Sequence, residues 1–293
     1  MFSTIVSTDT LASRLGDLWV IVDCRYDLRD ASWGPAQYRA GHIPGAVYAS
    51  LSHDLAVPSS GTNGRHPLPS IEAMEATFGR LGISQHTQVV TYDQDAGMYA
   101  SRMWWMLRHL GHDAVAVLDG GWAKWLREGR PVRDGQETRR AVVFTGRPRK
   151  ELLLGAADIE ARLGDSAVLL VDARSPERFE GRSEPIDRTP GHIPGAVNHF
   201  YKQNVTDEGV MLPPDTLRRQ FVDALGAHPP DRVVMYCGSG VTACHNILAM
   251  EHAGLSGTKL YPGSWSEWSS DPRRPVETGA TSSGKVEKFK VEK

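Results

Sequence analysis

Short apolar runs alternate with longer amphipathic stretches along most of this chain. Four runs of β-branched and other apolar residues are bounded by turn residues, which is typical of buried strands. These runs begin at Val20, Val89, Leu169 and Val233. Residues 98–111 and 241–254 instead carry the apolar spacing of helices. The alternation predicts an α/β fold in which each half of the chain has a mainly parallel sheet flanked by helices.

Glycines mark the ends of the predicted helices. Gly82, Gly111 and Gly254 each follow the last periodic position, where helices commonly finish with a left-handed residue. We therefore expect three helices to end just before these glycines.

An internal repeat divides the chain into two similar halves. The segment GHIPGAV begins at Gly41 and recurs at Gly191, 150 positions later, and the strand runs around it match in the same order. The sequence therefore predicts a duplicated domain, with residues 1–135 as the first copy and residues 151–277 as the second. Residues 136–150 are polar and arginine-rich and are predicted to be a linker. Residues 278–293 end in alternating Lys and Glu, and we expect a flexible tail there.

The charge balance narrows the possible functions. The chain has 33 basic and 35 acidic residues, a net charge of -2, which argues against a nucleic-acid partner held by bulk positive charge. It has no run of about 18 apolar residues, so we expect no membrane association. The first ten residues show no signal or transit pattern, and Cys24, Cys237 and Cys244 are an odd number of cysteines. We therefore expect a cytoplasmic protein.

The two halves differ at one chemically informative position. Tyr92 is followed by Asp93, whereas Tyr236 is followed by the loop CGSGVTA, which begins at Cys237. A strand that leads through two glycines into a helix turns backbone N–H groups inward and forms an anion-binding nest. Such a loop favours a thiolate, so Cys237 is a candidate nucleophile.

Alternative roles for this loop differ in how well they fit the spacing. A purely structural role for Cys237, as a small buried residue at a strand end, is not excluded by the spacing. A cysteine phosphatase would need an arginine where this chain has Ala243. Cys244 lies about two turns into the predicted helix and is expected to pack there. No second pair of ligands occurs at zinc spacing, and we expect no metal.

The paired GHIPGA segments, the loop at Cys237 and the GSWSEW element at Gly263 resemble the tandem rhodanese-domain sulfurtransferases. The loop is most similar to the 3-mercaptopyruvate branch, because Gly238 and Ser239 stand where the thiosulfate branch typically has basic residues. The resemblance implies two rhodanese-like domains with the site at their interface and a first domain that has lost its cysteine. It also implies a persulfide on Cys237 and no cofactor.

The resemblance further implies which residues hold the substrate. The family supplies arginines from the stretch before the second GHIPGA segment, where Arg178 is the first choice and Arg188 the second. The cysteine loop is expected to contribute the remaining substrate contacts. Its expected contact residues are Gly238, Gly240, Val241 and Thr242.

Proton handling in the mercaptopyruvate branch is attributed to a serine, a histidine and an aspartate. Ser239 matches the serine, and His66 matches the histidine that precedes a Leu-Pro pair. Asp54, twelve residues earlier, is expected to orient the imidazole.

The function expected from the resemblance is transfer of sulfur from 3-mercaptopyruvate to a thiol or to cyanide. The thiol acceptor would be a small thiol or a reduced thioredoxin-like protein. One alternative is a thiosulfate sulfurtransferase acting on thiosulfate and cyanide. Another is a non-catalytic sulfur-carrier or partner-binding module.

Overall fold

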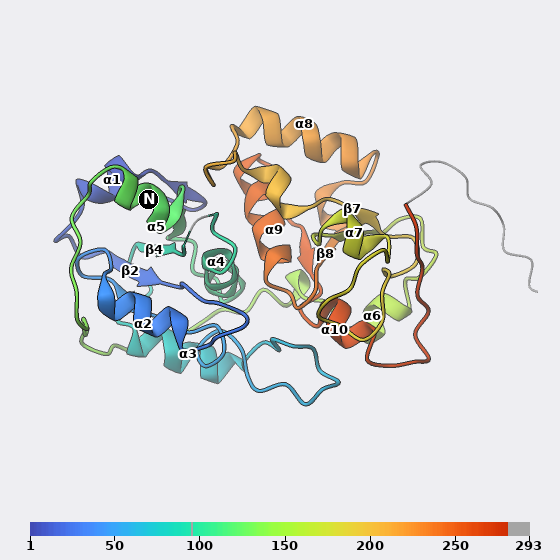
Figure 1. Ribbon diagram of the computed structural model, residues 1–293, viewed down its shortest axis with the longest axis horizontal. Coiled ribbons are helices and arrows are strands. Elements are labelled where there is room, and N and C mark those ends of the chain that lie inside the picture. Colours follow the sequence, from blue (N-terminus) through green and yellow to red (C-terminus); the bar gives the residue numbers. More distant parts are fainter. Residues whose placement is uncertain (95, 281–293) are drawn as a thin grey trace, which may run out of the picture.

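The structure, a computed structural model, describes residues 1–94 and 96–280. Each half contains one parallel sheet flanked by helices, which confirms the predicted fold class (Figure 1). The elements of the first half are β1 (Ile5–Val6), α1 (Thr8–Ala12), β2 (Val20–Asp23), α2 (Trp33–Ala40), β3 (Val47–Tyr48), α3 (Ile71–Arg80), β4 (Val89–Tyr92), α4 (Ala100–His109), β5 (Val115–Leu118) and α5 (Gly121–Arg127). The second half contains η1 (Lys150–Leu152), α6 (Ala156–Glu160), β6 (Leu169–Asp172), α7 (Pro176–Phe179), β7 (Val197–Asn198), η2 (Tyr201–Asn204), α8 (Pro214–Leu225), η3 (Pro230–Arg232), β8 (Val233–Tyr236), α9 (Thr242–His252), β9 (Lys259–Leu260) and α10 (Ser264–Trp268).

The two sheets share their central topology. The first has the strand order β1-β5-β4-β2-β3 and the second β7-β6-β8-β9, and every pairing is parallel. Strands β2, β4 and β8 are buried at every position, which explains why their sequences are mostly apolar rather than alternating. Parallel strands also end at the same sheet edge, so β6 and β8 deliver their following loops to one place.

A buried ion pair closes the same corner of both halves. Arg25 contacts Asp23 at 2.6 Å and donates to the Gly41 carbonyl at 2.6 Å. In the second half Arg174 contacts Asp172 at 2.7 Å and donates to the Gly191 carbonyl at 2.6 Å. The repeated Asp-x-Arg and GHIPGA segments therefore form one structural unit. The histidines of these segments also serve the fold, because each bonds to a backbone carbonyl.

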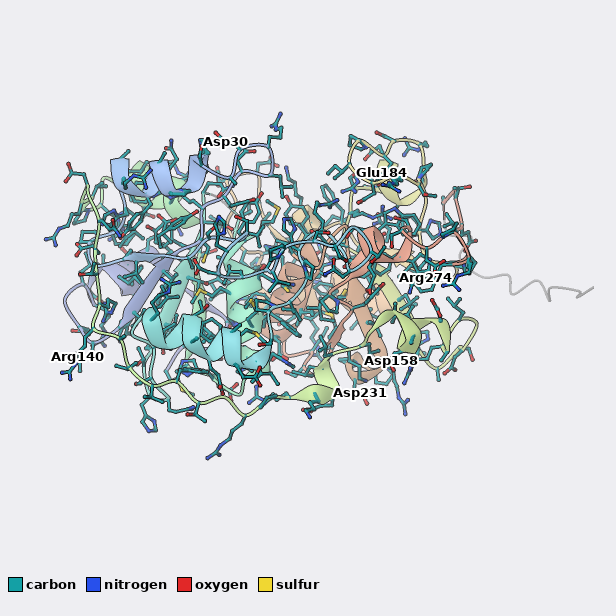
Figure 2. The ribbon with its side chains drawn as sticks, turned by 90° about the horizontal axis from the view of Figure 1, so that it is seen from below. Asp30, Arg140, Asp158, Glu184, Asp231 and Arg274 are labelled. Carbon is teal, nitrogen blue, oxygen red and sulfur yellow. The ribbon has the colours of Figure 1, made fainter. Side chains whose placement is uncertain are left out.

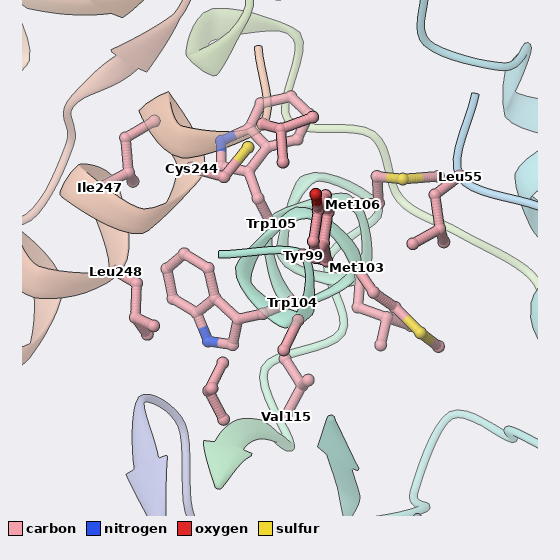
Figure 3. Packing of buried hydrophobic residues seen from close by; sticks show 14 of the residues in the cluster. Leu55, Tyr99, Met103, Trp104, Trp105, Met106, Val115, Cys244, Ile247 and Leu248 are labelled. Carbon is pink, nitrogen blue, oxygen red and sulfur yellow. The ribbon is translucent and has the colours of Figure 1, made fainter. Parts of the chain in front are cut away.

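The halves pack through two central helices. Helices α4 and α9 lie between the sheets in Figure 1 and contact each other directly. Figure 3 shows Trp104 and Trp105 of α4 beside Cys244, Ile247 and Leu248 of α9. All five side chains belong to one buried apolar cluster that spans both halves. The domain interface is therefore a continuous part of the core.

The connecting segment is hydrogen-bonded to the first half. The Val142 N–H donates to the Gly79 carbonyl at 3.0 Å, and the Arg147 N–H donates to the Leu110 carbonyl at 2.7 Å. In Figure 2 the chain near Arg140 follows the edge of the molecule towards the second half. The predicted domain boundaries at residues 135 and 151 stay predictions. Most of the predicted tail, residues 281–293, lies outside the described residues.

Among residues 1–94 and 96–280, no helix combines the length and the apolar character needed to cross a membrane.

Candidate active site

Cys237 stands at the carboxyl end of β8, immediately before the loop that leads into α9. Its side chain is buried, with 2% of the residue exposed, and its N–H donates to Ser264 Oγ at 3.1 Å. Its carbonyl accepts from the Trp265 N–H at 2.9 Å. These two bonds to the start of α10 fix the backbone of the cysteine on both sides.

The loop after Cys237 exposes backbone donors to any bound anion. Residues 238–241 are buried, yet within the described part of the chain their N–H groups donate to no protein acceptor. Buried N–H groups are nearly always paired, so such donors favour an anionic ligand. Gly240 is left-handed, with φ +75°, and a Cβ there would lie 2.5 Å from the Pro262 carbonyl. Only glycine fits this turn.

The corresponding loop of the first half already binds an anion, the side chain of Asp93. Its carboxylate accepts from the N–H groups of Gly97 at 2.9 Å, Tyr99 at 2.7 Å and Ala100 at 3.1 Å. Asp93 and Cys237 occupy equivalent positions after matched strands. The repeat therefore carries a loop whose geometry holds negative charge at the beginning of a helix.

A cavity of about 240 Å³ opens beside Cys237 at the domain interface. Leu28, Arg65, Met98 and Tyr99 line it from the first half. From the second half it is lined by Ala173, Arg174, Ser175, Arg178, Ile186, Phe200, Tyr201, Cys237, Gly238, Ser239, Val241 and Thr242. The expected contact residues Gly238, Val241 and Thr242 therefore reach the cavity, whereas Gly240 shapes the loop without lining it.

Arg178 lies in the cavity wall and is held by two carboxylates. Its guanidinium donates to Glu184 at 2.8 Å and to Asp187 at 3.0 Å. Burial disfavours ionisation of Glu184, but hydrogen bonds from Arg178 and from backbone N–H groups outweigh this effect and lower its pKa. Glu184 is therefore an anion that orients Arg178 beside Gly238.

Arg65, rather than Arg188, lines the cavity together with Arg178 and the ion-paired Arg174. Arg65 Nη1 contacts Asp187 at 2.7 Å, and its Nη2 lies 2.9 Å from the position that a Cβ on Gly238 would occupy. Arg188 is exposed and does not line the cavity. The register of an irregular loop decides which side chain turns inward, and this loop turns Asp187 inward and leaves Arg188 outside. The sequence signal for Arg65 was its position directly before His66.

Ser239 and His66 meet across the domain interface. Ser239 Oγ lies 2.8 Å from His66 Nδ1, and both residues are buried, with 5% and 7% exposed. Burial lowers the pKa of His66 to about 3, and the nearby cations Arg102 and Arg65 act in the same direction. The imidazole is therefore neutral at physiological pH and is able to share a proton with the Ser239 hydroxyl.

The structure does not bring Asp54 to His66. Asp54 accepts the Ser50 N–H at 2.8 Å through one oxygen and pairs with Arg80 through the other. Within the described residues its carboxylate makes no hydrogen bond to the imidazole. A carboxylate four residues after Ser50 closes its own turn, and this local bond competes with any reach towards His66. Asp54 therefore supports the loop that leads to the site.

The segment that carries Arg65 and His66 crosses from the first half to the second. The Arg65 N–H donates to Ser266 Oγ at 2.9 Å. Gly64 is left-handed, with φ +88°, and a Cβ there would lie 2.9 Å from the Gly263 carbonyl. This close backbone approach requires glycine and delivers the next two side chains into the cavity. In Figure 1 the loop before α3 extends towards α10.

The other two cysteines are fully buried away from the cavity. Cys244 Sγ donates to the Gly240 carbonyl at 3.1 Å, and burial raises the pKa of its thiol to about 12. Burial also raises the pKa of the Cys24 thiol, and the nearby charge of Asp23 raises it further. Both are therefore neutral thiols that pack in the core.

Comparisons with known proteins agree with this architecture. A model of the rhodanese-like domain matches residues 7–128 and again residues 155–271. A probable 3-mercaptopyruvate sulfurtransferase of Pseudomonas aeruginosa is 45% identical over 278 residues, which cover 94% of this chain and 98% of that protein. A putative thiosulfate sulfurtransferase of Mycobacterium tuberculosis is 40% identical over 268 residues, which cover 90% of this chain and 92% of that protein.

A solved structure shares the same arrangement of both halves. The 3-mercaptopyruvate sulfurtransferase from Leishmania major matches with a TM-score of 0.83 at 30% identity, and the match covers 94% of this chain and 76% of that one. The family model spans both sheets, and the relatives align along nearly the whole chain. The chain therefore belongs to the rhodanese family, with two rhodanese-like domains in tandem.

Proposed function

We propose that this sulfurtransferase takes sulfur from 3-mercaptopyruvate and carries it as a persulfide on Cys237. The main support for the proposal is the cavity beside Cys237. There Arg65 and Arg178, from different domains, lie on either side of the cysteine loop at Gly238. A relative that shares 45% of its residues carries the name of this activity.

The substrate is a small keto acid with one carboxylate. Arg65 and Arg178 present guanidinium groups that suit its carboxylate and keto oxygens. Gly238 has no side chain, which leaves space between the two guanidinium groups. A Cβ at this position would lie 2.9 Å from Arg65 Nη2 and 3.5 Å from Arg178. The substrate sulfur would then face Cys237, the thiol at the beginning of the loop.

The chemical step forms one S–S bond and breaks one C–S bond. The Cys237 thiolate attacks the sulfur of the substrate, and the C–S electron pair leaves on carbon as the enolate of pyruvate. The thiol proton of the substrate then moves to that carbon, which gives pyruvate and leaves the persulfide anion on Cys237. The neutral Ser239 and His66 pair provides a path for this proton. The backbone donors of the loop stabilise the persulfide anion that remains.

An acceptor then removes the outer sulfur and restores the Cys237 thiolate. The cavity mouth exposes Leu28 and Ile186, so a small thiol or cyanide has access to the sulfur. A reduced thioredoxin-like protein is a further proposed acceptor. We place the protein in the cytoplasm, because all three cysteines are free thiols, as suits a reducing compartment.

Thiosulfate is the alternative donor. A relative at 40% identity is named a putative thiosulfate sulfurtransferase, and the arginine pair would also attract this dianion. Steady-state rates with both donors, measured on one preparation, test the proposal. We expect a higher kcat/KM for 3-mercaptopyruvate. A higher kcat/KM for thiosulfate would reverse the assignment, and absence of turnover with either donor would favour a sulfur-carrier module.

A further inference from the structure

A buried guanidinium lies under the cysteine loop without a carboxylate partner. Arg102 of α4 is fully buried, and within the described residues it makes no ion pair. Its guanidinium donates instead to three backbone carbonyls. The contacts are Leu55 O at 3.2 Å, His66 O at 3.0 Å and Gly240 O at 3.2 Å. Burying a cation without an anionic partner costs folding free energy, so we expect the charge of Arg102 to serve a function.

These contacts join the two segments that build the site. Leu55 and His66 belong to the first domain, whereas Gly240 belongs to the cysteine loop of the second. Arg102 therefore fixes the backbone of His66 relative to the loop that follows Cys237. Because Arg102 is fully buried where α4 and α9 pack through an apolar cluster, little water screens its charge.

The titratable groups around Arg102 are two thiols and one imidazole. Negative charge on Cys244 or Cys237 would stabilise the Arg102 cation, whose pKa burial lowers. Burial keeps Cys244 a neutral thiol. Arg102 also lowers the pKa of His66. Arg65 and Arg178 lie beside Gly238, in the cavity wall.

We propose that Arg102 is a positioning residue of the active site, which supplies the positive charge that stabilises anionic sulfur on Cys237 and holds the His66 segment against the cysteine loop. This inference rests on the proposed role of Cys237 as the sulfur carrier, but it does not depend on which donor supplies the sulfur.

The test is the pH dependence of alkylation of Cys237 by iodoacetamide in the full-length protein, which needs no sulfur donor. Arg102→Gln removes the charge and keeps donors, so its alkylation profile should move to higher pH by about one unit or more. Arg102→Lys keeps the charge and should alkylate with the wild-type profile. Arg108→Gln is the matched control, because Arg108 lies on the same helix and pairs across the interface with Glu251 at 3.3 Å. Its profile should not move.

Two results would overturn the proposal. One is a wild-type alkylation profile in a folded Arg102→Gln variant, and the other is a profile in Arg102→Lys that moves as far as in Arg102→Gln. If Arg102→Gln does not fold, the Arg102→Lys profile decides alone, because the account requires it to match the wild type. Failure of 3-mercaptopyruvate as a donor would affect turnover but not this profile, so the two failures are distinguishable.

Discussion

Arg65 and Arg178, two of the three arginines that line the cavity, share the carboxylate of Asp187 and come from different domains. Each guanidinium is thereby oriented before a substrate arrives, which limits the entropy lost on binding. Removal of either arginine leaves Asp187 paired with the other, so the fold should tolerate the change. The effect of each substitution should therefore appear in substrate recognition.

We predict that Arg65→Ala and Arg178→Ala each raise the KM for 3-mercaptopyruvate about tenfold or more, because each removes a charge-assisted hydrogen bond to the substrate. Steady-state kinetics provide the measurement. Arg188→Ala is the matched control, since Arg188 is exposed and lies outside the cavity lining. If Arg65→Ala behaves like Arg188→Ala, Arg65 has no role in substrate binding.

Individual site residues differed in how far the sequence could predict their positions. Cys237, Ser239 and Arg178 line the cavity, as expected from motifs with fixed spacing, and His66 contacts Ser239 from the first domain. Arg65 was missed because its location depends on how an irregular loop crosses to the other domain. Side-chain direction in such a loop follows no period, so the only sequence signal for Arg65 was its position directly before His66.

Among the elements, the start of α4 is stabilised by the carboxylate of Asp93, which stands where the second half has Cys237. Asp93 accepts three backbone N–H groups of this helix start, at distances of 2.7 to 3.1 Å. We predict that Asp93→Ala lowers the free energy of unfolding by about 1 to 3 kcal/mol, because buried donors lose their acceptor. Chemical denaturation measures the loss. Asp93→Asn retains one oxygen and should lose less, whereas equal stability of Asp93→Ala and wild type would contradict the account.

The long elements were predictable because periodicity and glycine caps agree. Gly82, Gly111 and Gly254 have φ values of +80°, +79° and +73°, so the predicted helix ends are confirmed. The edge strands β3 and β7 were not predicted. Each has only two residues, which is too short for a repeating pattern, and each forms by pairing with β2 or β6.

At the scale of the whole molecule, buried and partly buried histidines couple stability to pH. Burial lowers the pKa of several imidazoles from 6.5. These are His66, His109, His112, His192, His199 and His252. The unfolded chain then binds more protons than the folded chain below about pH 6.5. Stability is therefore complete above the unfolded value and is lost as the pH falls towards the lower folded values.

We predict that the free energy of unfolding decreases as the pH falls from about 6.5 to about 5, by up to about 1.4 kcal/mol per pH unit for each fully buried histidine. Denaturant titrations at several pH values measure this slope. His66→Gln should reduce it, because the pKa of His66 falls to about 3 in the folded protein. A free energy that stays constant or rises over this pH range would contradict the coupling.

If Cys237 carries sulfur from 3-mercaptopyruvate, the intact mass of the protein after treatment with this donor should show it. We predict one added sulfur in the wild type and in Cys24→Ser and Cys244→Ser, and none in Cys237→Ser. The reason is that Cys237 borders the cavity, whereas the other thiols are packed in the core. Added sulfur in Cys237→Ser, or its localisation to Cys24 or Cys244 in the wild type, would contradict the claim.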